Sequence, residues 1–142
     1  MQLIAMNQGE LVATTEKRQY VSLPPGVGDL PFSNAVAIGN TLYLAGHIGF
    51  DPSTRKPADD PVQEAHHVLD SMRDTLARAG FTMQDVVSLT IFCPELSLFD
   101  TFNKVYRTYF HPPFPARAFI GSGPLLFGAR FEIQAIAVKA SD

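Results

Sequence analysis

Arg117 is the residue of this chain whose type and setting most clearly suggest chemistry. It sits in the apolar run 114–120, which contains no acidic residue. A guanidinium stays charged in proteins, and removing it from water without a partner is costly. Its planar fork fits a carboxylate through two parallel hydrogen bonds. Two interpretations stay open: Arg117 is a structural or surface arginine paired with a distant acid, or it is held free to bind an anion.

The run around Arg117 has the pattern of a strand. Pro115 can begin a strand, and the residues after it alternate with a period of two. On a strand, Arg117 and Phe119 point to one face and the residues between them to the other.

Other residue types that could carry chemistry do not form a recognisable site. His66 and His67 are adjacent, so a helix would point them about 100° apart, and neither His47 nor His111 has a metal-ligand partner at suitable spacing. No phosphate-binding Gly-Lys-Ser/Thr loop occurs, so neither a metal nor a cofactor is expected. Cys93 precedes a proline and is expected to be a small buried residue.

Length and composition narrow the class of protein. The 142 residues fit one domain, and the net charge of −3 without basic runs gives no reason to expect nucleic acid as a partner. A single cysteine excludes an intramolecular disulfide framework and fits a reducing compartment. The chain has no signal-peptide pattern and no run of about 20 apolar residues, so a cytoplasmic protein without membrane contact is expected.

Hydrophobic periodicity predicts the order β-β-β-α-β-α-β-β. Strands are predicted over 18–23, 35–38, 41–45, 85–92, around Arg117 and over 129–138. Helices are predicted over 61–79 and 98–111. Gly39-Asn40 predicts a hairpin turn. Asp60 is a suitable N-cap with Pro61 at the first position and Gln63 completing a capping box, and Gly80 ends that helix. Ser97 is expected to cap the second helix.

The first helix has one apolar face. Its members repeat at spacings of three and four: Val62, Ala65, Leu69, Met72, Leu76 and Ala79. Residues 1–16 are interpreted as an N-terminal extension, partly ordered at most, and residues 17–142 as a single α+β domain with both helices on one sheet face. The other face carries apolar residues with nothing in the chain to cover it, which predicts a homo-oligomer.

Four sequence blocks, taken in order, resemble the RidA/YjgF family of enamine/imine deaminases. They are residues 31–36, 42–52, 115–117 and 131–137, within a resemblance that extends from about residue 24 to 138. The resemblance implies a chorismate-mutase-like fold in a homotrimer, with the three sheets forming a central barrel and ligand clefts between subunits.

The resemblance also implies roles for particular residues. Arg117 would bind the carboxylate of a 2-imino acid, and the backbone amides of Gly46 and Phe119 would help to hold it. Phe32, where the family usually has tyrosine, would pack nearby. Gln134 is interpreted as standing where the family has a glutamate, and an amide can orient water but cannot exchange a proton near neutral pH.

The function implied is hydrolytic deamination of 2-imino or enamine acids to 2-keto acids and ammonia. Because Gln134 replaces a proton carrier, the alternative is a non-catalytic trimeric binder of small carboxylate metabolites. His47 either takes over proton transfer from the cleft or is a loop histidine without a role. Glu132 is expected to neutralise Arg130 or Arg107. The ribonuclease activity associated with some members is not favoured, because the acidic chain lacks a basic groove.

Overall fold

The structure is a computed structural model, and it describes residues 2–7, 10–15 and 17–140. Its strands are β1 (Gln2–Asn7), β2 (Glu10–Thr15), β3 (Arg18–Val21), β4 (Ala35–Ile38), β5 (Thr41–Leu44), β6 (His47–Ile48), β7 (Val86–Cys93), β8 (Ala116–Gly121) and β9 (Glu132–Val138). Its helices are α1 (Pro61–Arg78) and α2 (Phe99–Tyr106), with short 3₁₀ turns at Met83–Asp85, Leu96–Leu98 and Leu126–Gly128. From β3 onward the predicted order is confirmed, with the short β6 added.

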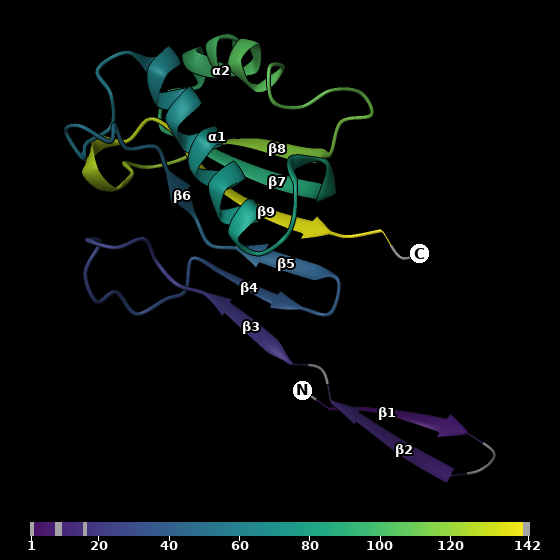
Figure 1. The fold of residues 1–142 in the computed structure, drawn as a ribbon. Helices are drawn as coiled ribbons and strands as arrows, with labels where there is room; N and C mark the ends of the chain where they lie inside the picture. The colour runs from purple at the N-terminus through teal and green to yellow at the C-terminus, as the bar shows by residue number, and fades with distance from the viewer. Residues whose placement is uncertain (1, 8–9, 16, 141–142) are drawn as a thin grey trace.

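The main sheet has the strand order β3-β4-β5-β9-β7-β8, and β6 pairs with β9 beside β5 (Figure 1). Neighbouring strands are antiparallel except β7 and β8, which are parallel because the crossover through α2 joins them. The predicted hairpin between β4 and β5 is confirmed, and Gly39 in its turn has a φ of 56°, a conformation that favours glycine.

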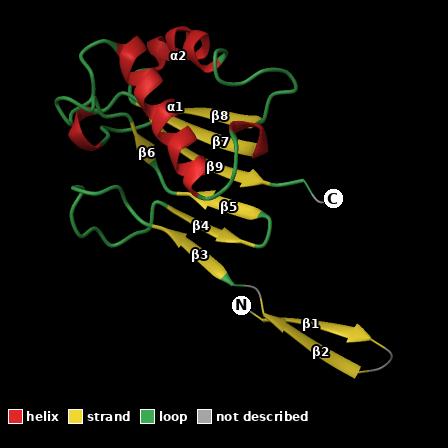
Figure 2. Ribbon diagram, viewed as in Figure 1, coloured by secondary structure: helices red, strands yellow, loops and turns green. Residues whose placement is uncertain are grey.

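Both helices cover the same face of the main sheet, as predicted (Figure 2). The core lies between them and the sheet. Its completely buried members include Ala65, Leu69, Met72 and Leu76 of α1, Phe102 of α2, and Leu42, Ile91 and Phe131 from the sheet side. The period-two pattern of β9 is confirmed, because Ile133, Ala135 and Ala137 are all buried while the residues between them are not.

Helix α1 begins where the sequence predicts and ends one residue earlier, at Arg78. The Asp60 side chain accepts a hydrogen bond from the Val62 backbone N–H at 3.0 Å, and Gly80 follows the helix with a φ of 81°. The predicted inner position of Val62 is wrong, since 39% of this residue is exposed. Glu64 is completely buried instead, because the inner stripe of the helix runs through Glu64, Val68 and Met72 at intervals of four.

The start of α2 differs from the prediction. Ser97 does not cap the helix; Leu98 is the N-cap residue, and its side chain makes no capping hydrogen bond. The physical reason is the 3₁₀ turn before it, in which the Leu98 N–H donates to the Glu95 carbonyl at 3.0 Å and leads the chain directly into the helix.

The N-terminal segment contains two strands that its weak periodicity did not predict. Strands β1 and β2 pair in antiparallel register from Gln2 opposite Thr15 to Asn7 opposite Glu10, in a sheet separate from the main one (Figure 1). The domain boundary at residue 17 stays a prediction, although β3 begins at Arg18.

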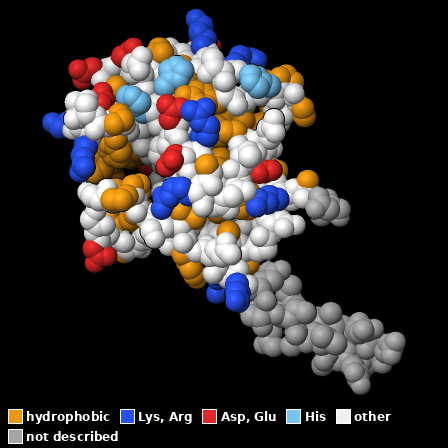
Figure 3. All heavy atoms as spheres, viewed as in Figure 1, with side chains coloured by type: hydrophobic (Ala, Val, Ile, Leu, Met, Phe, Trp, Pro, Cys, Tyr) orange, Lys and Arg blue, Asp and Glu red, His pale blue; other side chains and the backbone are white. Residues whose placement is uncertain are grey.

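The face of the main sheet opposite the helices is open within residues 17–140. Tyr43 is 50% exposed on it, and Ile120 is 43% exposed. The face of the molecule seen in Figure 3 has basic and acidic side chains interspersed rather than gathered by sign. Among the described residues, neither helix has the length and apolar character that spanning a bilayer requires.

Candidate functional site

Arg117 lies on β8 with its side chain on the helix side of the sheet. It pairs with Leu89 of β7, and both Arg117 and Phe119 are half-buried while the residues between and beside them are exposed. Its guanidinium carbon lies 4.8 Å from the centre of the Tyr106 ring and 5.6 Å from that of Phe99. Aromatic faces stabilise a cation at such distances, so the charge is supported without an acid.

No carboxylate among residues 17–140 pairs with Arg117. The ion pairs in this part of the chain join Arg73 to Asp70 and Arg130 to Glu64. The guanidinium of Arg117 also makes no hydrogen bond to a residue in this range. Within the described protomer, the arrangement therefore favours the anion-binding interpretation of Arg117 over that of an internal ion pair.

A pocket of about 400 Å³ opens beside Arg117, between α2 and the segment that leads into β8. Its walls include Phe99, Asn103, Tyr106, Arg107, Phe114 and Arg117, and no acidic residue. The Tyr106 hydroxyl and the Asn103 Oδ1 atom are buried and have no hydrogen-bond partner among residues 17–140. Burial raises the pKa of Tyr106, and the charge of Arg117 partly opposes this effect. The pocket thus presents the side chains of two arginines to a ligand.

A second group of candidate atoms lies where β5 gives way to β6. Gly46 occupies this junction, and a Cβ atom added to it would overlap the Glu132 carboxylate. Glu132 is placed there by strand pairing, opposite Ile48 of β6. Burial raises the pKa of the Glu132 carboxyl above its ordinary value. A carboxyl that holds its proton to higher pH is better suited to exchange protons with a substrate.

The residues predicted for the site do not all meet within one protomer. Arg117 and Phe119 do meet, with 5.7 Å between the guanidinium carbon and the ring centre. Gln134 is exposed on the open face of the sheet, the face opposite to that of Arg117, and lines a shallow hollow there. Phe32 is 52% exposed in the loop between β3 and β4, and neither it nor Gly46 lines the Arg117 pocket.

The expected partners of Glu132 are wrong. Arg130 binds Glu64, with 2.8 Å between its Nη1 atom and Oε1, and Glu132 makes no ion pair within residues 17–140. The position of Glu132 beside Gly46 depends on the pairing of β6 with β9, which no local sequence pattern predicts.

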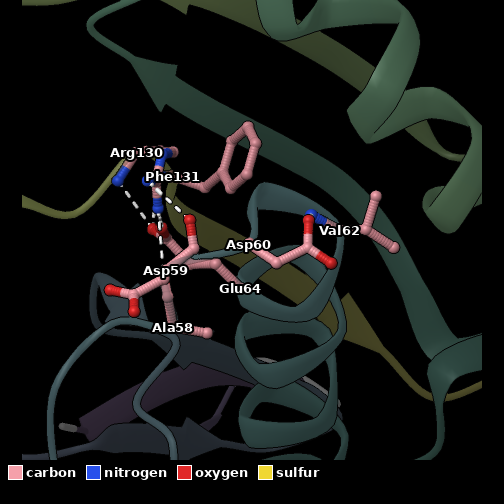
Figure 4. A network of polar contacts seen from close by, with 7 residues as sticks. All are labelled: Ala58, Asp59, Asp60, Val62, Glu64, Arg130 and Phe131. Carbon is pink, nitrogen blue, oxygen red and sulfur yellow. Dashed lines mark hydrogen bonds and ion pairs between the residues drawn. The ribbon is translucent and has the colours of Figure 1, made fainter.

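Glu64 and Arg130 form a network that fixes the start of β9 (Figure 4). The Glu64 carboxylate accepts hydrogen bonds from the backbone N–H groups of Arg130 at 2.6 Å and Phe131 at 3.2 Å. Arg130 in turn donates to the carbonyl oxygens of Ala58 and Asp59, both at 2.9 Å. The first turn of α1 thereby holds the segment that carries Glu132. The four-residue interval to Val68 was the only sequence signal that Glu64 faces inward.

His47 does not face a cleft. It is buried, its Nδ1 donates to the Ala45 carbonyl at 2.7 Å, and its Nε2 lies 2.8 Å from the Thr75 hydroxyl. Asn34 donates to the same hydroxyl at 2.8 Å. Burial lowers the pKa of His47, so the neutral ring is favoured. His47 therefore has a structural role: its hydrogen bonds to Ala45 and Thr75 connect the junction between β5 and β6 to helix α1.

The remaining candidates behave as structural residues. Cys93 is buried, as predicted, and desolvation raises the pKa of its thiol, which disfavours the reactive thiolate. Across the described residues, no group of three or more His, Cys, Asp or Glu side chains is arranged to hold a metal ion.

The fold and the pocket together define a small α+β protein with an arginine-lined pocket beside an edge strand. A family model described as Endoribonuclease L-PSP matches residues 28–139, and the chain belongs to that family, which includes the RidA/YjgF proteins. The family resemblance found in the sequence is thereby confirmed.

Similar proteins of known name and structure agree with this assignment. The human 2-iminobutanoate/2-iminopropanoate deaminase is 37% identical over 124 residues, which cover 86% of this chain and 90% of that protein. The crystal structure of RidA from an Antarctic Psychrobacter species superposes with a TM-score of 0.78 at 31% identity, covering 85% of this chain and 99% of that one. A putative endoribonuclease from Thermotoga maritima superposes with a TM-score of 0.79 at 33% identity, covering 87% and 98% of the two chains.

Proposed function

We propose that this protein is a hydrolytic deaminase that converts 2-imino acids, or the enamine acids from which they form, to 2-keto acids and ammonia. The observation that carries the proposal is the guanidinium of Arg117, supported by aromatic rings and unpaired with any carboxylate of residues 17–140, at a pocket of ligand size. The names of its relatives as 2-iminobutanoate/2-iminopropanoate deaminases point to the same substrate class.

The chemistry assigns separate tasks to the groups of the site. Arg117 binds the substrate carboxylate and fixes its orientation, and its charge withdraws electron density from the neighbouring imine carbon. Water adds to the C=N carbon, the nitrogen takes up a proton, and ammonia leaves as the C=O bond forms.

Glu132 is the proposed proton carrier. Its carboxyl lies against Gly46, has a raised pKa and has no ion-pair partner within residues 17–140. Gln134 keeps the role of a residue that could orient water, but its side chain is two positions further along the same open face. A retained carboxylic acid removes the main reason for preferring a non-catalytic binder.

A second protomer completes this proposed site. Arg117 faces the helices, while Glu132 begins a strand whose unburied side chains face the open side of the sheet. In a homotrimer that buries the open faces, the pocket of one protomer would lie against the Gly46 junction of its neighbour. The homotrimer and its clefts are part of the proposal.

The test is to generate 2-iminopropanoate in place, using an amino-acid oxidase acting on alanine, and to measure keto-acid release with and without the protein. Acceleration by the wild type and its loss in Arg117→Ala are expected, while Arg78→Ala, at the exposed end of α1, should behave as wild type. No acceleration by a folded protein, or an Arg117→Ala variant as fast as wild type, would contradict the proposal. Binding of a keto acid without turnover would instead favour the carboxylate binder.

A further inference from the structure

The pocket beside Arg117 has a second arginine that deamination of a simple imino acid leaves unused. Arg107 follows the last residue of α2, and its side chain lines the same pocket. Its guanidinium carbon lies 5.6 Å from the centre of the Phe114 ring. Like Arg117, it pairs with no carboxylate among residues 17–140.

The two arginines rest on a common aromatic support. The rings of Tyr106 and Phe114 stack with their centres 6.5 Å apart and an interplanar angle of 29°. Arg117 lies over Tyr106 and Arg107 lies over Phe114, so each of the two stacked rings makes a cation–π contact with one guanidinium. This support limits the positions of both cations relative to each other on the pocket wall.

Two like charges on one pocket wall repel each other, and the pocket lining contains no acid to compensate them. A ligand with two negative groups would compensate both charges. Guanidinium groups bind carboxylates with particular geometric specificity. A ligand with one carboxylate and an apolar chain would satisfy Arg117 and leave Arg107 without a partner.

We propose that Arg107 binds a second carboxylate of the substrate, so that the pocket selects dicarboxylic 2-imino acids, the class formed by two-electron oxidation of amino dicarboxylic acids or by loss of a β-substituent from those that carry one. This inference rests on the proposed function, because Arg117 must hold the carboxylate next to the imine carbon. It assigns to Arg107 the task of distinguishing between substrates.

The inference is tested with stable keto acids, which are the reaction products, by titration calorimetry. The ligands are 2-oxobutanoate, 2-oxoglutarate and 2-oxohexanoate; the last resembles 2-oxoglutarate in length but lacks its second carboxylate. Because hydrogen bonds to charged groups contribute measurably to binding, wild type should bind 2-oxoglutarate roughly tenfold more tightly than either monocarboxylate.

Variants at position 107 identify the group responsible. Arg107→Ala should weaken 2-oxoglutarate binding by about tenfold and 2-oxobutanoate binding by a clearly smaller factor, while Arg107→Lys should restore part of the preference. Lys104→Ala removes an exposed positive charge from the same helix but outside the pocket lining, and should change neither ligand. Circular dichroism of each variant checks that the exposed substitutions preserve the fold.

The outcomes separate this inference from the proposed function. If 2-oxobutanoate binds through Arg117 but 2-oxoglutarate has no advantage, or if Arg107→Ala weakens both equally, the second-carboxylate inference is wrong and the deaminase proposal stands. If 2-oxohexanoate matches 2-oxoglutarate, chain length rather than charge sets the preference, and the inference is again overturned. If no keto acid binds to wild type, both proposals are contradicted together.

Discussion

The Glu132 carboxylate lies against the α-carbon of Gly46, which has no side chain to keep it away. Strand pairing on both sides holds Glu132 there, because it stands opposite Ile48 of β6 and opposite Phe92 of β7. A ligand bound at the Gly46 backbone would therefore meet a carboxyl group directly.

Gly46→Ala should reduce deaminase activity by about tenfold or more while the protein stays folded. The added methyl group must displace the end of the Glu132 side chain. Even a small displacement of a catalytic group lowers the reaction rate substantially. The measurement is keto-acid release combined with a thermal unfolding curve. Gly123→Ala is the matched control, because a Cβ there has open space around it. Equal activity of the two variants would show that the Gly46–Glu132 contact is irrelevant to the reaction.

Glu132→Gln should lower the rate by about 10²–10⁴-fold, the usual contribution of a general acid or base. The amide has nearly the same shape, so thermal stability should not fall. Steady-state rates of wild type, Glu132→Gln and Gln134→Ala compare the two candidate residues. A Gln134→Ala variant that loses more activity than Glu132→Gln would return the catalytic role to position 134.

The same substitution has a predicted effect on the pH dependence of stability. Burial raises the folded-state pKa of Glu132, so the neutral form is the favoured one in the folded protein. The corresponding stability is fully present below the unfolded-state pKa of about 4.3 and is lost as pH rises through the folded-state value. Glu132→Gln should therefore unfold at a higher temperature than wild type at pH 7, and the difference should disappear near pH 4. A difference that grows on acidification would contradict this sign.

Mixing two inactive variants should restore activity if the site is shared between protomers. Arg117→Ala and Glu132→Gln each remove one half of the proposed site, so a mixed oligomer regains interfaces with both wild-type residues. The variants are unfolded together, refolded, and assayed against the same variants refolded separately. Recovery only in the mixed sample supports the shared site. Absence of recovery in mixed oligomers of confirmed composition would place the whole site in one protomer.

Glu64→Gln should destabilise the protein by about 3 kcal/mol, because it leaves the Arg130 guanidinium without its carboxylate in a partly buried setting. Denaturant unfolding measures the loss. The exposed ion pair of Arg73 and Asp70 offers a comparison, and Arg73→Gln should cost less than about 1 kcal/mol. Similar costs for the two variants would mean that burial does not decide the value of the Glu64 pair.

Local signals in the sequence predicted most of the fold. Asp60 accepts a hydrogen bond at the start of α1, next to Pro61 at the first helical position, and Gly39-Asn40 forms the turn between β4 and β5. Residues close in sequence therefore determine where each of these elements begins or ends. The predicted start of α2 was wrong, although Ser97 is a residue type that often caps helices. A 3₁₀ turn precedes the helix there and leads the chain into it without a side-chain cap.

The site was less predictable because its parts are far apart in the chain. Glu64 meets Arg130 across 66 residues, and Glu132 reaches Gly46 only after β6 and β9 have paired. Arg117 was recognisable because its immediate neighbours are apolar. His47 could not be judged from its loop, since its partner Thr75 lies 28 residues away on α1.

The aromatic rings around Arg117 bear on how the protein could handle a short-lived molecule. Resting against Tyr106, Phe99 and Phe119, the guanidinium has fewer rotamers left to lose when a carboxylate arrives. Capture would then require little rearrangement. A compound that hydrolyses spontaneously must be bound before it reacts with water. For such a compound a preorganised binding site matters more through its association rate than through its affinity.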